Sequence, residues 1–387
     1  MSPFYKAAHT STKAGSRART GIITTPHGTV QTPAFVPVAT KGTLKGLSPI
    51  QIDSVHAQLS FVNTYHLVTH PGHEVVKNAG GIHAYSGMQR TLMSDSGGFQ
   101  VFSLAKQSRR ASVRGDEDPM LVKISESGVQ FRSLFDGQLI EFSPEKSMEY
   151  QIDIGADIHM AFDECTYNGA THEYTVESVH RTHGWLDRCI AYRRDHSHPT
   201  HIQFLYGIIQ GGCFEDLRIE SAKHLRTREV DGVAIGGVSV GESKSEMRDQ
   251  VRWISPYLPE DKPVHLLGVG HMDDILDLVA YGIDTFDCVE PSRLARMGIL
   301  LMIEGLHGPL SQLKWSELDM TKNEFKSDFT LLPIPQTILG IQPTYSYLHH
   351  LFKQKELLGY TIATVHNLLV MESLMARIRR GIEENEI

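Results

Sequence analysis

The segment DTFDCVEPSRLAR occupies residues 284–296 of this chain and combines an apolar run with a carboxylate and two arginines. It begins as a short apolar strand that ends abruptly on the carboxylate of Asp287. A turn containing Pro291 follows and carries two arginines, Arg293 and Arg296. Two interpretations are open at this point. Asp287 either caps a helix beside solvated arginines, or it is a nucleophile in front of which the arginines hold a polyanion.

The same order of apolar strand, polar residue and turn recurs along the chain. Strands are predicted at residues 34–39, 59–63, 91–94, 157–162, 204–209, 232–235, 264–267 and 283–286. Amphipathic helices are predicted between many of them, at residues 174–194, 215–228, 244–254 and 273–281, and a further helix begins at Ser143. This alternation predicts an α/β protein with a (β/α)8 TIM barrel.

Polar residues fall just past the carboxyl ends of five of these strands. They are Asp95, Asp163, Gln210, the pair Gly236 and Gly237, and Asp287. Any one of them could be a turn former or a helix cap. Together they indicate a functional site, because barrel enzymes assemble their sites at this rim.

The barrel is expected to form a catalytic domain over residues 1–300, with a polar insertion at about residues 105–142. Two short β runs around the Pro-His-Gly turn that begins at Pro26 predict an N-terminal hairpin lid. Residues 301–387 are expected to be a C-terminal helical subdomain packed on the barrel.

The composition is that of a soluble globular protein, with 41% hydrophobic and 21% charged residues. No run approaches the roughly 20 apolar residues that cross a membrane, and the start MSPFYKAAHTST lacks an apolar signal core, so we expect a cytoplasmic protein. The net charge of -8 argues against a protein that coats nucleic acid through bulk electrostatics. Four widely spaced cysteines suggest neither disulfides nor a cysteine-rich metal site.

The rim residues suit a flat, polar heterocycle such as guanine. A carboxylate accepts paired N–H donors, and Gln210 and the glycine backbone can meet a carbonyl oxygen and ring nitrogens. Phe99 and Leu267 could sandwich the ring. A carboxylate nucleophile beside such a pocket indicates glycosidic chemistry.

These residues lie in segments that resemble the signature segments of the tRNA-guanine transglycosylase family. The segments are DSGGFQVFS (95–103), MAFDEC (160–165), QGG (210–212), AIGGVSVGE (234–242), FDCVEPSRLAR (286–296) and TVHN (364–367). The resemblance runs from about Ala18 to the end. It implies that guanine is cut out of the anticodon wobble position of tRNA and a 7-deazaguanine is inserted.

Carried over to the matching positions, the resemblance implies that Asp287 forms a covalent RNA intermediate and that Asp95 is the general acid/base. Residues implied to bind the base are Ser96, Gly97, Gly98, Phe99, Asp163, Gln210, Gly237, Val238, Glu242 and Leu267. Residues implied to line the RNA path are Gly268, Val269, Gly270, His271, Met272, Asp273, Asp274, Ser292, Arg293, Leu294, Ala295 and Arg296. Glu242 would lie behind the peptide between Val238 and Ser239 and stabilise either of its orientations.

Cys165 and Val240 match a tight pocket that, in this family, accompanies the aminomethyl base preQ1, so we expect preQ1 rather than queuine. The family also carries a zinc site of three cysteines and a histidine after the barrel. Those cysteines fall here at Pro335, Thr337 and Gly340, and only His366 is kept. We therefore expect no metal or other cofactor, with His366 a hydrogen-bonded core histidine.

The resemblance implies a homodimer, because Tyr347, His350 and Leu351 match positions in the family's dimer contact. An alternative is a non-catalytic tRNA-binding partner subunit of a heterodimeric transglycosylase. The presence of both Asp95 and Asp287 favours an active enzyme. A barrel glycosidase or phosphate-sugar enzyme would have Glu-rich strand ends and a phosphate-binding loop after the eighth strand, which the sequence lacks.

Overall fold

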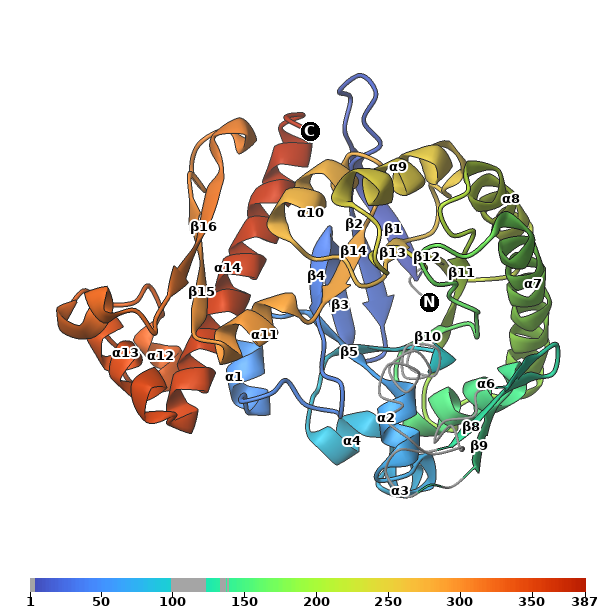
Figure 1. The fold of residues 1–387 in the computed structure, drawn as a ribbon, viewed down its shortest axis with the longest axis horizontal. Helices are drawn as coiled ribbons and strands as arrows, with labels where there is room; N and C mark the ends of the chain where they lie inside the picture. Colours follow the sequence, from blue (N-terminus) through green and yellow to red (C-terminus); the bar gives the residue numbers. More distant parts are fainter. Residues whose placement is uncertain (1–3, 99–122, 133–136, 138) are drawn as a thin grey trace, which may run out of the picture.

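Eight parallel strands form a single sheet at the centre of the molecule (Figure 1). A computed structural model describes residues 4–98, 123–132, 137 and 139–387. In spatial order the strands are β4 (Ala34–Pro37), β14 (Thr285–Cys288), β13 (Val264–Leu266), β12 (Gly232–Ile235), β11 (Phe204–Ile209), β10 (Ile158–Met160), β6 (Thr91–Ser94) and β5 (Leu59–Val62). A parallel bridge between Val38 and Phe61 joins the two end strands and closes the sheet. The predicted (β/α)8 barrel is confirmed.

Helices surround the barrel on its outer face (Figure 1). They are α1 (Pro49–Ser54), α2 (Thr64–Thr69), α3 (His73–Asn78), α4 (Ile82–Ser86), α6 (Pro144–Ile154), α7 (His172–Asp195), α8 (Glu215–Arg226), α9 (Lys244–Ile254), α10 (Met272–Val279), α11 (Glu290–Arg296) and α14 (Leu357–Glu383). Their starts follow local chemistry. Ser143 accepts the Lys146 N–H at 3.2 Å ahead of Pro144, and Ser243 and Glu246 form a reciprocal capping box for α9.

A three-stranded antiparallel sheet covers the amino-terminal end of the barrel. It contains β1 (Tyr5–Thr10), β2 (Arg19–Thr25) and β3 (Gly28–Thr32). Tyr5, Ile23 and Val30 pack against side chains inside the barrel. The guanidinium of Arg19 pairs at 2.6 Å with Asp284, which directly precedes β14. The predicted hairpin lid is therefore β2 and β3, and it closes the end of the barrel opposite the strand carboxyl ends.

Smaller elements lie outside the barrel. The described part of the predicted insertion is a sheet of β7 (Lys123–Ser125), β8 (Gly128–Arg132) and β9 (Leu139–Phe142). After the barrel come the ribbon β15 (Ile299–Glu304) and β16 (Lys314–Asp319), then α12 (Gln336–Leu339) and α13 (Tyr345–Gln354), with short 3-10 turns at Leu310–Gln312 and Asn323–Ser327. A further 3-10 turn, Ser255–Tyr257, follows α9 within the barrel. Helix α14 packs against α11, β15 and β4, so the chain end returns to the barrel.

None of the helices within the described residues is both long enough and apolar enough to cross a lipid bilayer.

Candidate active site

Asp287 lies inside the last part of β14. The predicted strand ended before it, but parallel pairing with β4 continues through Asp287 and Cys288. The side chain points to the rim and the residue is 9% exposed. Its Oδ1 accepts the backbone N–H of Gly268 at 2.9 Å and lies 3.1 Å from Nε2 of His265. Oδ2 has no hydrogen-bond partner among the residues that the structure describes, so it is free to act on a ligand.

His265 on β13 was not identified as a site residue from the sequence. It is completely buried, and its ring stacks on that of Phe61 at 5.7 Å. Its Nδ1 lies 2.8 Å from Oγ1 of Thr285. Because an ionised carboxylate only accepts, Nε2 of His265 carries the proton toward Asp287, and Nδ1 accepts from the Thr285 hydroxyl. The histidine thereby fixes the orientation of the Asp287 carboxylate.

Asp95 follows β6 and is held by the loop after β5. Its Oδ1 accepts the backbone N–H of Thr64 at 2.7 Å, and its Oδ2 accepts from the side-chain amide of Asn63. The backbone carbonyl of Asp95 accepts from the Thr64 hydroxyl. Charge-assisted hydrogen bonds of this kind stabilise an ionised carboxylate and hold it in one rotamer. The loop after β5 therefore holds a carboxylate at the rim.

Asp163 and Gln210 form a hydrogen-bonded pair in the floor of the site. Nε2 of Gln210 donates to Oδ2 of Asp163 at 2.6 Å, and the Ser96 hydroxyl donates to Oδ1 at 3.1 Å. Burial raises the pKa of Asp163 to about 6, although both hydrogen bonds oppose the rise. Oε1 of Gln210 is buried without a hydrogen-bond partner among the described residues. An unsatisfied buried acceptor is costly, so this oxygen is poised for a donor on a ligand.

Glycines after β12 let the backbone approach this amide. A Cβ on Gly237 would stand 2.3 Å from Oε1 of Gln210, and a Cβ on Gly236 would stand 2.6 Å from Nε2. Arg218 on α8, which the sequence did not single out, lies behind both loops. Its buried guanidinium donates to the carbonyls of Gly212 (2.8 Å), Gly236 (2.6 Å) and Gly237 (2.7 Å). Burial lowers the pKa of Arg218 to about 10, which leaves it charged at neutral pH.

Glu242 contacts the peptide between Val238 and Ser239, as the family resemblance implies. Its Oε1 accepts the Ser239 N–H, and its Oε2 accepts the Val240 N–H at 2.9 Å. Ser239 has a φ of 59°, in the left-handed region that non-glycine residues seldom occupy. In a planar trans peptide the Val238 carbonyl points away from the Ser239 N–H, and so away from Glu242. A carboxylate thus stabilises one orientation of this peptide.

The glycine turn after Asp95 also approaches its neighbours closely. Gly97 has a φ of 81°, and a Cβ there would stand 2.4 Å from the ring of Phe142. A Cβ on Gly98 would stand 2.8 Å from the Asp163 carbonyl. Leu267, directly after β13, is half-buried beside the barrel interior. Phe99, expected to stack on the base, lies outside the described residues.

The segment expected to line the RNA path is only partly open to solvent. Gly268 and Arg293 are exposed, and His271 and Asp273 are half-buried. Asp274 is buried and pairs with Arg248 at 2.7 Å. The other predicted residues are buried or half-buried and support the backbone; they are Val269, Gly270, Met272, Ser292, Leu294, Ala295 and Arg296. A polyanion would meet Arg293 and the backbone at Gly268 first.

The positions at which the resemblance implies zinc ligands do not fit that metal. Pro335 and Gly340 flank α12 and, like Thr337, offer no ligand of the cysteine or histidine type. His366 is buried in α14, and its Nε2 lies 2.8 Å from the carbonyl of Leu301. Burial lowers the pKa of His366. The hydrogen bond to Leu301 satisfies the histidine within the core.

Known proteins are similar in sequence to this chain over nearly its whole length. Residues 13–387 match the family described as "TGT: Queuine tRNA-ribosyltransferase". A queuine tRNA-ribosyltransferase from Roseiflexus sp. (strain RS-1) is 40% identical over 382 residues, covering 95% of this chain and 94% of the relative. One from Lysinibacillus sphaericus (strain C3-41) is 40% identical over 385 residues, covering 99% of this chain and 93% of the relative. One from Natranaerobius thermophilus (strain ATCC BAA-1301 / DSM 18059 / JW/NM-WN-LF) is 40% identical over 390 residues, covering 100% of this chain and 96% of the relative.

Proposed function

This chain belongs to the queuine tRNA-ribosyltransferase family of tRNA-guanine transglycosylases, and we propose that it exchanges guanine at the tRNA wobble position for preQ1 through a covalent intermediate on Asp287. The observation that carries the proposal is the carboxylate of Asp287, fixed through Oδ1 with Oδ2 open at the barrel rim. Asp95 and the pair of Asp163 and Gln210 follow neighbouring strands of the same rim.

The chemistry follows from these positions. Oδ2 of Asp287 attacks C1′ of the wobble nucleotide, the bond from C1′ to N9 breaks, and guanine leaves with the electron pair and takes up a proton delivered through Asp95. Asp95 then removes the N9 proton of the incoming base, which attacks C1′ and releases Asp287. One proton is taken up and one is given back, so the exchange is balanced. The target base has to leave its stack to reach this rim.

Base recognition uses the pocket floor. Ionised Asp163 accepts the paired N–H donors of the guanine-like edge, and the open Oε1 of Gln210 accepts another donor. The choice of preQ1 rests on Cys165 and Val240, which match a tight pocket. Burial raises the pKa of Cys165 to about 12, so it is a neutral thiol in the wall of that pocket. A small pocket disfavours a bulky substituent by only about 1–3 kcal/mol.

Two experiments test these assignments. Radiolabelled guanine is incubated with tRNA and the parent or the Asp287→Asn variant, and denaturing electrophoresis follows a protein–RNA adduct. We expect exchange and an adduct only with the parent. If the variant exchanges guanine at the parental rate, the assignment of Asp287 as the nucleophile is wrong. If the parent shows no exchange, the alternative of a non-catalytic tRNA-binding partner subunit is supported. Mass spectrometry of tRNA after competition between preQ1 and queuine tests the base, and preferential insertion of queuine overturns the preference.

The proposed homodimer involves α13. Tyr347 is 41% exposed and His350 is exposed, so both side chains are available to a second copy. Leu351 is 5% exposed and belongs to the core of its own chain, so we assign it to packing. Analytical ultracentrifugation of the parent and of Tyr347→Glu tests this surface, because a charge at a self-complementary contact should shift the dimer toward monomer. A monomeric parent contradicts the proposal.

A further inference from the structure

Three side chains meet at the amino-terminal end of the barrel, opposite the candidate active site. His27 lies in the turn between β2 and β3, Asp157 directly precedes β10, and His201 lies in the loop between α7 and β11. One ring nitrogen from each histidine and one oxygen of the carboxylate all lie within 4.8 Å of one another. The three residues are far apart in sequence, so no sequence motif predicts the cluster.

The geometry of His201 indicates a missing partner. Its Nδ1 lies 3.2 Å from the hydroxyl of Thr200. Its Nε2 is buried, and no hydrogen-bond partner reaches it among the described residues. Leaving a buried polar atom unsatisfied costs about 1–3 kcal/mol, so such atoms usually have a ligand, water or ion. With Nδ1 turned toward the Thr200 hydroxyl, Nε2 is the ring nitrogen of His201 that is open to a ligand.

Asp157 supplies the charge of the cluster. Its Oδ1 lies 2.7 Å from Nδ1 of His27, and its Oδ2 accepts the Leu92 N–H at 2.9 Å. The ring of His83 stacks on that of His27 at 3.5 Å and places Nε2 3.3 Å from Oδ2 of Asp157. The His27 ring and the Leu92 N–H thus hold both oxygens of the Asp157 carboxylate, which fixes its orientation.

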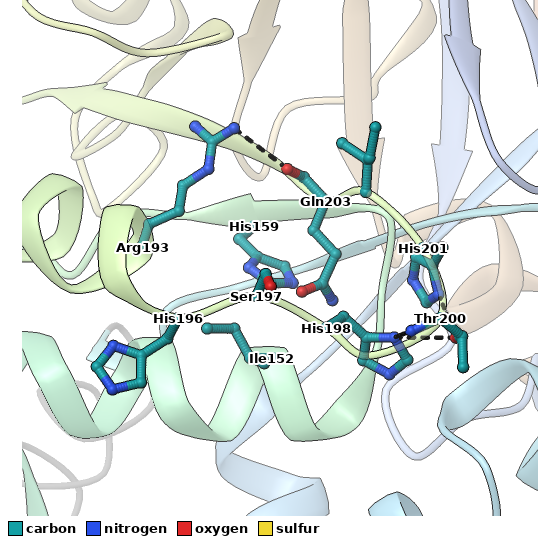
Figure 2. Close-up of a pocket in the computed structure, with 10 residues that line it drawn as sticks. Ile152, His159, Arg193, His196, Ser197, His198, Thr200, His201 and Gln203 are labelled. Atoms are coloured by element: carbon teal, nitrogen blue, oxygen red, sulfur yellow. Dashed lines mark hydrogen bonds between the residues drawn. The ribbon is translucent and has the colours of Figure 1, made fainter.

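A cavity of about 430 Å³ lies next to the cluster. Its lining includes His159, His196, His198 and His201. Figure 2 shows that His198 and His201 project from the same loop beside Thr200. Because His201 lines it, a cavity of this size has room for an ion and its waters beside the ring.

We propose that His27, Asp157 and His201 bind one divalent transition-metal ion of the zinc type. Two imidazoles and one carboxylate are a common ligand set for such ions. Ligand atoms about 2.0–2.1 Å from a tetrahedral ion lie about 3.3 Å apart, so the His27 and Asp157 atoms need to separate by only about 0.6 Å. Rotation of the His201 ring, which belongs to a loop, closes the remaining distance. Water completes the coordination.

The ion would have a structural role. It would join the turn of the sheet under the barrel, the start of β10 and the loop before β11. It lies at the opposite end of the barrel from Asp287, so binding should raise thermal stability and leave exchange kinetics unchanged. The alternative is a metal-free hydrogen-bonded network of His27, Asp157 and His83 that merely holds the sheet in place. A metal at this cluster would contradict the expectation of no metal, which rested on the wide spacing of the cysteines and on the residues at the C-terminal zinc positions.

The experiment uses full-length, tag-free protein treated with a chelator and then titrated with Co²⁺, followed by competition with Zn²⁺. Visible absorption of bound Co²⁺ reports coordination number, calorimetry gives stoichiometry and Kd, and thermal unfolding is recorded with and without Zn²⁺. The variant His201→Ala removes one ligand. The control His196→Ala removes an exposed histidine of the same loop and cavity, whose Nδ1 contacts the carbonyl of Tyr192.

We expect one ion per chain in the parent and in His196→Ala, and at least tenfold weaker binding in His201→Ala, since even the loss of a supporting residue costs about 10–100-fold. Zinc should raise the Tm of the parent and the control only. Absence of stoichiometric binding, or equal Kd values for all three proteins, overturns the proposal. Equal metal-free Tm values exclude misfolding of His201→Ala. His27→Gln, which can keep a hydrogen bond to Asp157, provides a second ligand deletion with the same expected loss.

Discussion

Replacing Asp163 by asparagine should stabilise this protein while abolishing its base exchange. Asp163 is a buried carboxylate whose partners, Gln210 and Ser96, are neutral. Burial raises its pKa from 3.8 to about 6. The folded state therefore holds this proton more tightly than the unfolded state does. The resulting stability is fully present below about pH 4 and is lost as the pH rises through about 6.

The size of the effect follows from that difference. A shift from 3.8 to about 6 corresponds to about 3 kcal/mol at pH 7 relative to a side chain that never ionises. An amide is isosteric and stays satisfied, because its oxygen accepts from Gln210 and its nitrogen donates to the Ser96 hydroxyl. For 387 residues, 3 kcal/mol corresponds to about 4 °C in Tm. Exchange should fall by more than about 100-fold, because the charged acceptor for the base is gone.

Differential scanning calorimetry of the parent and Asp163→Asn between pH 4 and pH 7.5 measures the effect. The Tm difference should be near zero at pH 4 and grow to its full value above pH 6. Asp284→Asn is the matched control at the other end of the barrel. Its carboxylate is paired with Arg19 at 2.6 Å, so the substitution should destabilise by about 3–5 kcal/mol. A lower Tm for Asp163→Asn, or a difference that does not vary with pH, would refute the reasoning.

Three other substitutions test the geometry of the rim. His265→Phe keeps the ring stacked on Phe61 but removes a hydrogen bond to a carboxylate worth about 1.5–3 kcal/mol, so kcat/KM for guanine exchange should fall at least about tenfold; an unchanged value contradicts a positioning role. Arg218→Lys replaces a planar fork by one ammonium that cannot reach all of its carbonyls, so KM for the base should rise and Tm should fall in the same variant. Glu242→Gln weakens the hold on the Ser239 N–H, and steady-state assays should show KM for preQ1 changing several-fold while KM for guanine stays close to the parental value.

The sequence predicted the barrel because its strands are short apolar runs that end in polar turns. Asp95 and Gln210 directly follow β6 and β11, as predicted, because a polar residue directly after a buried run is a strong local signal. The strand before Asp163 was predicted to reach residue 162 but ends at Met160. The extent of β14 was misjudged. Asp287 was expected past the strand, but pairing with β4 carries the strand through it, and pairing partners are not visible in one sequence.

Other features depend on tertiary contacts that have no local pattern. His265 is one polar residue within an apolar strand, so from the sequence it is expected to be an ordinary core residue. Arg218 lies on a helix whose other charged residues face solvent, so its burial is set by the loops it contacts. Strand β1 was missed because only Tyr5 in it is buried, which leaves no alternation of apolar and polar residues. The cluster of His27, Asp157 and His201 is created entirely by folding.

Arg218 holds the loops after β11 and β12 through their main chain, because its hydrogen-bond acceptors in these loops are carbonyl oxygens. The hydrogen bonds of Arg218 therefore hold these two loops without depending on which side chains the loops carry. The half-buried Val240 can change in size without removing any of these hydrogen bonds, whereas Val238 is part of the core. A designer seeking a transglycosylase for an unnatural base should alter a side chain such as Val240 and leave the arginine in place.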